Sequence, residues 1–95
     1  MTSLSTHILD TAAGEPAAGV AVELHRGPEQ IASTHTDSDG RARLADDLEP
    51  GLYSLVFHPT SPFFRRVELE LELEAGHYHV PLLVSPYSCA SYRGS

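Results

Sequence analysis

The stretch Val67-Glu68-Leu69-Glu70-Leu71-Glu72-Leu73-Glu74 decides the fold class of this chain. Apolar and acidic residues alternate with period two, which places four apolar side chains on one face of a strand and four glutamates on the other. Leu and Glu both favour helices, but on a helix this pattern would spread the leucines around the whole circumference. The alternation therefore predicts a half-buried β-strand whose glutamate row faces solvent and discourages edge-to-edge pairing.

Similar segments occur along the rest of the chain, separated by turns rich in Gly, Pro and Asp. We expect seven further strands, at residues 5–9, 20–25, 31–36, 42–44, 52–58, 78–84 and 89–92. Eight short strands with regularly spaced turns are typical of an all-β, Greek-key β-sandwich. The sequence contains no convincing helix, internal repeat or linker.

Length and charge narrow the class of protein. Ninety-five residues form one domain, spanning 1–95, and a chain of this size buries only about 60–65% of its unfolded surface. Oligomerisation is a common way to bury more. The formal net charge of −7 argues against nucleic acid and anionic membranes as partners, because both require a basic surface.

Cysteine content and hydropathy predict a soluble, cytoplasmic protein. The single cysteine, Cys89, excludes an intrachain disulfide, whereas small secreted domains usually have several. Residues 1–7 lack the basic and apolar regions of a signal peptide. No apolar stretch approaches the roughly 20 residues that a transmembrane helix needs.

Two local motifs favour a structural role over a reactive one. Asp37-Ser38-Asp39-Gly40 is similar to part of a calcium loop, but it lacks the longer run of ligands and the downstream glutamate, so we expect a hairpin turn. Cys89 is flanked by Ser88 and Ala90, which offer neither a base nor a positive charge, so we do not expect a nucleophile.

Histidine is unusually frequent, with six residues at positions 7, 25, 35, 58, 77 and 79. His77 and His79 are two apart and share one face of a strand, and His7 lies near the start of the first strand. Three converging imidazoles could bind zinc, but no carboxylate or cysteine lies at a ligand spacing beside them, so no metal is predicted. His25, His35 and His58 are expected to be structural or surface residues.

Arg41 directly follows the Asp-Gly pair, in a chain with only six basic residues. One interpretation is a surface ion pair with Asp37 or Asp39, worth ~0–1 kcal/mol. The other is a guanidinium that stabilises an oxyanion or a polarised carbonyl. Position alone leaves both open.

The end of the chain, Tyr92-Arg93-Gly94-Ser95, has the composition of a terminus that frays. It follows the apolar run Val80-Pro81-Leu82-Leu83-Val84, which we expect to be buried. We therefore expect a strand to bring the tail into a structured place, where it has a function.

Three segments together resemble the 5-hydroxyisourate hydrolases, the enzymatic members of the transthyretin-like family. They are Leu4-Ser5-Thr6-His7-Ile8-Leu9-Asp10-Thr11 with Gly14-x-Pro16-Ala17 after it, Thr36-Asp37-Ser38-Asp39-Gly40-Arg41, and His77-Tyr78-His79-Val80-Pro81-Leu82-Leu83-Val84-Ser85-Pro86 with the terminal Tyr-Arg-Gly-Ser. The third is the most specific.

The resemblance implies an eight-stranded Greek-key sandwich that assembles as a homotetramer, a dimer of dimers with clefts at the dimer–dimer interface. It implies hydrolysis of a ring amide of 5-hydroxyisourate, a small molecule on the route from urate to allantoin, without a cofactor. The catalytic residues it implies are His7, Arg41, His79 and the terminal Ser95, with Tyr92, Arg93 and Gly94 shaping the pocket. Which histidine is the general base stays open.

The sequence departs from the family pattern in two places. Residues 59–66 form a short connection where the family usually has a short helix, so we expect that helix to be lost. Ser88-Cys89-Ala90-Ser91 replaces the more usual Gly-Tyr-Ser-Thr close to the tail. Two alternatives to the hydrolase remain: a transthyretin-like protein that binds a small hydrophobic ligand in the same channel, and a catalytically silent sandwich module.

Overall fold

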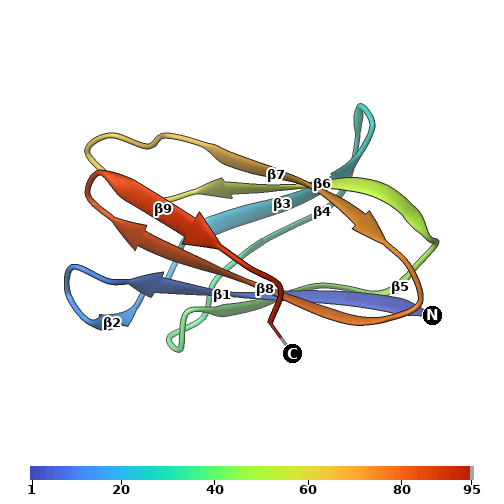
Figure 1. Ribbon diagram of the computed structural model, residues 1–95, viewed down its shortest axis with the longest axis horizontal. Coiled ribbons are helices and arrows are strands. Elements are labelled where there is room, and N and C mark those ends of the chain that lie inside the picture. Colours follow the sequence, from blue (N-terminus) through green and yellow to red (C-terminus); the bar gives the residue numbers. More distant parts are fainter. Residues whose placement is uncertain (95) are drawn as a thin grey trace.

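The computed structural model describes residues 1–94 and forms a sandwich of two β-sheets that lie face to face (Figure 1). The described residues form nine strands and no helix: β1 (Thr2–Asp10), β2 (Glu15–Pro16), β3 (Ala21–Arg26), β4 (Glu29–His35), β5 (Arg41–Leu48), β6 (Gly51–His58), β7 (Val67–Leu73), β8 (Gly76–Ser85) and β9 (Ser88–Ser91). All eight predicted strands are present. The two-residue β2 is the addition, and β1 and β5 are longer than predicted.

The first sheet is built around β1. This strand pairs antiparallel with β5 and, at its far end, with β2. On its other side it pairs in parallel with β8, which in turn pairs antiparallel with β9. The second sheet has the order β4-β3-β6-β7 and is entirely antiparallel. The predicted all-β sandwich is therefore confirmed.

The core lies between the sheets and follows from the alternation in the sequence. Inward-facing residues of β1 and β3, such as Leu4, Ile8, Val22 and Leu24, are fully buried. On β7 the apolar residues pack against the core while the four glutamates at positions 68 to 74 are exposed, as the period-two pattern predicts. The opposite residues of β1 and β8 point outward, which matters for the site.

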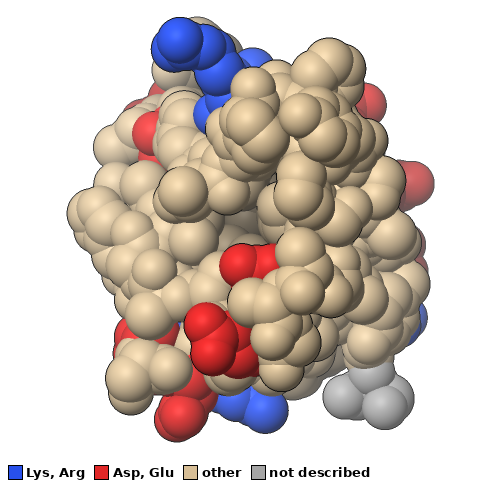
Figure 2. Space-filling view, turned by 90° about the vertical axis from the view of Figure 1, so that its left-hand side faces the viewer, with Lys and Arg blue, Asp and Glu red and all other residues tan. Residues whose placement is uncertain are grey.

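One end of the sandwich holds the short connection at residues 59–66, which contains no helix. Figure 2 shows this end as a largely uncharged face with a hollow near its centre. The pocket there has a volume of about 320 Å³ and is lined by four prolines, at positions 16, 59, 62 and 86, and by the carboxylates Asp10 and Glu15. It contains no histidine or arginine, so the predicted chemistry has to be sought elsewhere.

Candidate functional site

The outer face of the β5-β1-β8 part of the first sheet brings three of the predicted site residues together. His7 on β1 lies directly opposite Arg41 on β5, in antiparallel register. His79 enters from β8, where it is paired with Ser5, two residues before His7 on the same face of β1. The centroids of the His7 and His79 rings are 6.5 Å apart. Segments far apart in the sequence thus meet on three neighbouring strands.

The turn before β5 holds Arg41 in place. One carboxylate oxygen of Asp37 accepts hydrogen bonds from the backbone N–H groups of Asp39 and Arg41, at 2.9 and 3.0 Å. Gly40 has φ 75° and donates its N–H to the Asp37 carbonyl oxygen at 2.9 Å. A Cβ at Gly40 would lie 2.5 Å from the carbonyl oxygen of Ile8, so only glycine fits this approach to β1.

The prediction of a hairpin at residues 37–40 was wrong in one respect. The segment is a tight turn, but β4 before it and β5 after it belong to different sheets. The turn therefore carries the chain across the sandwich. Because Arg41 is the first residue after this crossing, it enters the first sheet at the edge beside His7.

His79 is held on two sides. The hydroxyl oxygen of Ser5 lies 2.8 Å from its Nδ1 atom, and the backbone N–H of Gly94 donates to its carbonyl oxygen at 2.6 Å. Burial lowers the pKa of the His79 imidazole below its ordinary value, and the positive charge of Arg41 and of two nearby histidines lowers it further. A neutral imidazole at neutral pH is the state that a general base requires.

His7 differs from His79 in its surroundings. Its Nε2 atom is buried and has no hydrogen-bond partner among residues 1–94. A buried polar nitrogen without a partner is costly, and such groups concentrate at functional sites.

An open cleft of about 570 Å³ lies on this face. Arg41 and His79 line it, and its other lining residues are Ser5, Thr6, Thr34, His35, Asp37, Ala42, Arg43 and His77. His7 does not line it directly. Two of the chain's six basic residues are here, in a protein with a net charge of −7. Arg43 is paired with Asp46, and the Asp37 carboxylate also lines the cleft, so Arg41 is the group that would attract an anionic small molecule there.

The tail residues are divided between two places. Gly94 pairs with His79 in an isolated antiparallel bridge, and a Cβ at Gly94 would lie 2.9 Å from Cδ2 of His79. Tyr92 and Arg93 instead line a groove beside β7, where the Arg93 guanidinium lies 4.2 Å from the centroid of the Tyr78 ring. Ser95, the fourth predicted catalytic residue, lies outside the described residues.

Sequence reasoning missed the serines that contact the histidines. Ser3 lies 2.6 Å from Nδ1 of His77, and Ser5 lies 3.2 Å from Nε2 of the same ring. The signal was present, because Ser3, Ser5 and His7 alternate along one strand just as His77 and His79 alternate along another. What was lacking was the parallel pairing of β1 with β8, which a local pattern does not reveal.

Other candidates receive less support. Burial raises the pKa of the Cys89 thiol, which disfavours the reactive thiolate. Within residues 1–94, no three His, Cys, Asp or Glu side chains are grouped so as to hold a metal ion. The described part of the chain also has no helix with the length and hydropathy that crossing a membrane requires.

Sequence comparison places the chain among known proteins. The profile of the HIUase/Transthyretin family matches residues 4–94. The 5-hydroxyisourate hydrolase of Caulobacter vibrioides is 45% identical over 115 aligned positions, which cover the whole of both chains. The 5-hydroxyisourate hydrolase of Pseudomonas aeruginosa is 40% identical over 117 positions, covering all of this chain and 93% of the relative. Both alignments are longer than this chain, so these relatives contain residues with no counterpart here.

Comparison with solved structures agrees with the sequence comparison. Klebsiella pneumoniae 5-hydroxyisourate hydrolase superposes with a TM-score of 0.91 and 36% identity, over the full length of both chains. Sea bream transthyretin in complex with thyroxine superposes with a TM-score of 0.86 and 26% identity, over 96% of this chain and 93% of that one. The fold is therefore shared by a hydrolase and by a protein that binds a small ligand.

Proposed function

Because this chain belongs to the HIUase/Transthyretin family, we propose that it hydrolyses 5-hydroxyisourate in the degradation of urate to allantoin. The observation that supports this most directly is the meeting of His7, Arg41 and His79 on three adjacent strands, where Arg41 and His79 line an open cleft. Relatives that are 40% and 45% identical over the whole chain are 5-hydroxyisourate hydrolases, which adds to the support.

The chemistry follows from the side chains. His79 acts as general base and removes a proton from a water molecule, since its lowered pKa keeps it neutral. The resulting hydroxide attacks the ring carbonyl carbon, and the guanidinium of Arg41 stabilises the oxyanion that forms. Collapse of this intermediate breaks the C–N bond of the ring amide, and the proton passes to the leaving nitrogen. His7 supports this arrangement from beside the cleft, opposite Arg41 and next to the His79 ring.

The C-terminal tail completes this site. Gly94 fixes the backbone beside His79, and we propose that the residue after it, Ser95, takes part in substrate binding. Tyr92 and Arg93 support the tail from the groove beside β7. No cofactor takes part in the reaction. Deleting residues 92–95 should abolish turnover while leaving the unfolding transition nearly unchanged.

The assembly we propose is a homotetramer, a dimer of dimers with the cleft at the dimer–dimer interface. Three features support it: the chain is short, the cleft is open on one side, and the half-buried Leu83 lies on the same outer face as His79. A second copy packed over this face would exclude water from the reacting groups. Sedimentation at micromolar concentration should give four chains, and a clean monomer would contradict this assembly.

The cytoplasm is the compartment that we propose for the reaction. Cys89 forms no disulfide among the described residues, and a free, partly buried thiol is compatible with a reducing environment. Fractionation of cells that express the protein with a small internal epitope would test the assignment.

The deciding experiment follows the ultraviolet decay of freshly generated 5-hydroxyisourate, with and without the untagged protein. We expect a clear acceleration over the spontaneous rate. If a folded tetramer gives no acceleration, the hydrolase proposal fails. The alternative, a protein that binds a small ligand, would then be favoured by the similarity to sea bream transthyretin in complex with thyroxine, and calorimetric titration would test it.

A further inference from the structure

A continuous line of hydrogen-bonding side chains connects His79 with the surface. Ser5 Oγ lies 2.8 Å from Nδ1 of His79 and 3.2 Å from Nε2 of His77. Ser3 Oγ lies 2.6 Å from Nδ1 of His77. The line begins at the partly buried His79 and passes through the exposed His77 to Ser3. It crosses between β1 and β8 three times, which the parallel register of these strands makes possible.

From this geometry we infer that Ser5 and His77 are positioning residues that set the tautomer of His79 and relay its proton during hydrolysis. The inference rests on the proposed function for the reaction step. Ser5 and His77 are outside the proposed catalytic set of His7, Arg41, His79 and Ser95. His77 is the first histidine of the His77-Tyr78-His79 segment, and it thereby gains a role of its own.

The hydrogen-bond donors and acceptors along this line determine the tautomer of His79. If Nε2 of His79 is to accept a proton from water, the ring must have its own proton on Nδ1. That N–H then donates to Ser5 Oγ. The Ser5 hydroxyl has one proton, which is free to donate to Nε2 of His77, and His77 in turn donates from Nδ1 to Ser3. Each group in the line therefore donates once in the same direction.

The relay step balances in protons and charge. When Nε2 of His79 takes a proton from the attacking water, its Nδ1 proton moves to Ser5, and the Ser5 hydroxyl proton moves to Nε2 of His77. The positive charge is then on the exposed His77 ring, away from Arg41. When the C–N bond breaks, the path runs backwards, and Nε2 of His79 returns the proton to the leaving nitrogen. No proton is gained or lost over the cycle.

The electrostatics of the cleft explain why such a relay is useful. A charged His79 would be partly buried and close to the positive charge of Arg41, two conditions that disfavour an imidazolium. The exposed His77 ring is solvated, which makes it the better place for the charge. Moving the charge by two hydrogen bonds therefore lowers the cost of deprotonating the water.

The test replaces Ser5 by Ala and His77 by Gln, with Ser33→Ala on β4 and His25→Gln on β3 as matched controls. Both controls lie on the other sheet, and neither lines the cleft. We expect Ser5→Ala and His77→Gln each to lower kcat roughly 10- to 100-fold with little change in KM, as for loss of a group that orients a reactive histidine. Ser5→Thr, which restores a hydroxyl, should regain most of the rate.

Two readouts distinguish a relay from a merely structural role. A proton inventory in mixtures of light and heavy water should curve for the unaltered protein, because several protons move together, and become linear in Ser5→Ala. Imidazole ¹⁵N NMR should show His79 protonated on Nδ1 in the unaltered protein and on Nε2 in Ser5→Ala. Unchanged rates in both variants, or a His79 ring protonated on Nε2 in the unaltered protein, would overturn the inference.

The NMR measurement needs no substrate, so it separates this inference from the proposed function. If the unaltered protein does not accelerate the decay of 5-hydroxyisourate, the proposed function and the relay step both fail. The tautomer assignment is still decided by the spectrum. If the unaltered protein is active and the variants match it, only the relay fails.

Discussion

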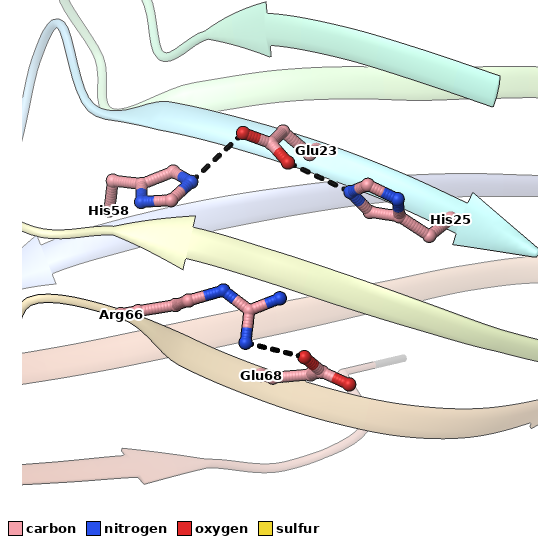
Figure 3. A network of polar contacts seen from close by, with 5 residues as sticks. All are labelled: Glu23, His25, His58, Arg66 and Glu68. Carbon is pink, nitrogen blue, oxygen red and sulfur yellow. Dashed lines mark hydrogen bonds and ion pairs between the residues drawn. The ribbon is translucent and has the colours of Figure 1, made fainter. Parts of the chain in front are cut away.

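The outer faces of the two sheets both have histidines, and the neighbours of these histidines differ. On the β4-β3-β6-β7 sheet, Glu23 lies between His25 and His58, with carboxylate oxygens 2.8 and 2.9 Å from their Nε2 atoms (Figure 3). On the β5-β1-β8 face, His7 and His79 lie beside a guanidinium and serine hydroxyls. A carboxylate stabilises a protonated imidazole, whereas Arg41 disfavours one.

The neighbours of these histidines indicate a structural role for His25 and His58 and a catalytic role for His7 and His79. The hydrogen bonds from His25 and His58 lower the pKa of Glu23, and the contact of Glu23 with His58 links β3 to β6. The same sheet also has the ion pair of Arg66 with Glu68 at 2.7 Å (Figure 3). The expectation of a structural role for His25 and His58 agrees with these contacts.

Among the substitutions that test this difference between the two faces, we expect one at Arg41 to lower activity the most. Arg41→Gln should lower kcat/KM roughly 10²- to 10³-fold, as for loss of one group that stabilises an oxyanion. Arg66→Gln on the other sheet is the control, because Arg66 pairs with Glu68 and lies outside the cleft. The ultraviolet assay measures both. Similar rates for the two variants would mean that Arg41 has no special role.

A smaller effect is expected from Gly94. Gly94→Ala adds a Cβ that would lie 2.9 Å from Cδ2 of His79, so either the tail or the imidazole has to shift. We expect about a 10-fold loss of kcat, since small displacements of a reacting group are costly. Urea unfolding should change little. An unaltered rate would show that the bridge between Gly94 and His79 does not position the site.

The features that the sequence predicts well are those that depend on residues close together in the chain. The alternation at residues 67–74 is enough to predict β7, because period two is a local property. The family resemblance names His7, Arg41 and His79, and the structure places them on adjacent strands. The contact of Ser5 with His79 joins residues 74 positions apart, so it depends on a register that no local pattern specifies.

Contacts between distant parts of the chain also explain the other features that the sequence does not predict. Glu23 and His25 alternate on one strand, so their contact was predictable, but the third member, His58, comes from β6. The turn at residues 37–40 has the sequence of a hairpin, and only the packing of the sheets directs β5 into the first sheet. The two-residue β2 is too short for a periodic signal.

The pH dependence should follow His79. Burial and the nearby charge of Arg41 lower its folded-state pKa below the ordinary value of about 6.5, so the ring becomes protonated only at lower pH. We expect the acid limb of kcat/KM to have its midpoint below that value. The unfolded chain binds a proton at His79 more readily than the folded chain, so this group favours unfolding as the pH falls through about 6.5 and below. A limb centred above 6.5 would contradict a neutral, partly buried base.

The smallest effect is expected from the other sheet. Glu23→Gln removes the carboxylate between His25 and His58, so the urea midpoint at pH 7 should fall slightly while turnover stays the same. The folded-state pKa of Glu23 is lowered, so its contribution is present above the unfolded pKa of about 4.3 and is lost as the pH falls through the folded value. The difference between the two proteins should therefore shrink in acid. A loss of turnover in Glu23→Gln would contradict a purely structural role for the β4-β3-β6-β7 face.

The most direct test compares one histidine from each face. His79→Asn and His58→Asn make the same chemical change on opposite sheets, and the decay of 5-hydroxyisourate reports on both. We predict a loss of roughly 10²-fold or more for His79→Asn, as for removal of a general base, and a nearly unaltered rate for His58→Asn. Equal rates for the two variants, with both proteins folded, would contradict the assignment of the active site to the β5-β1-β8 face.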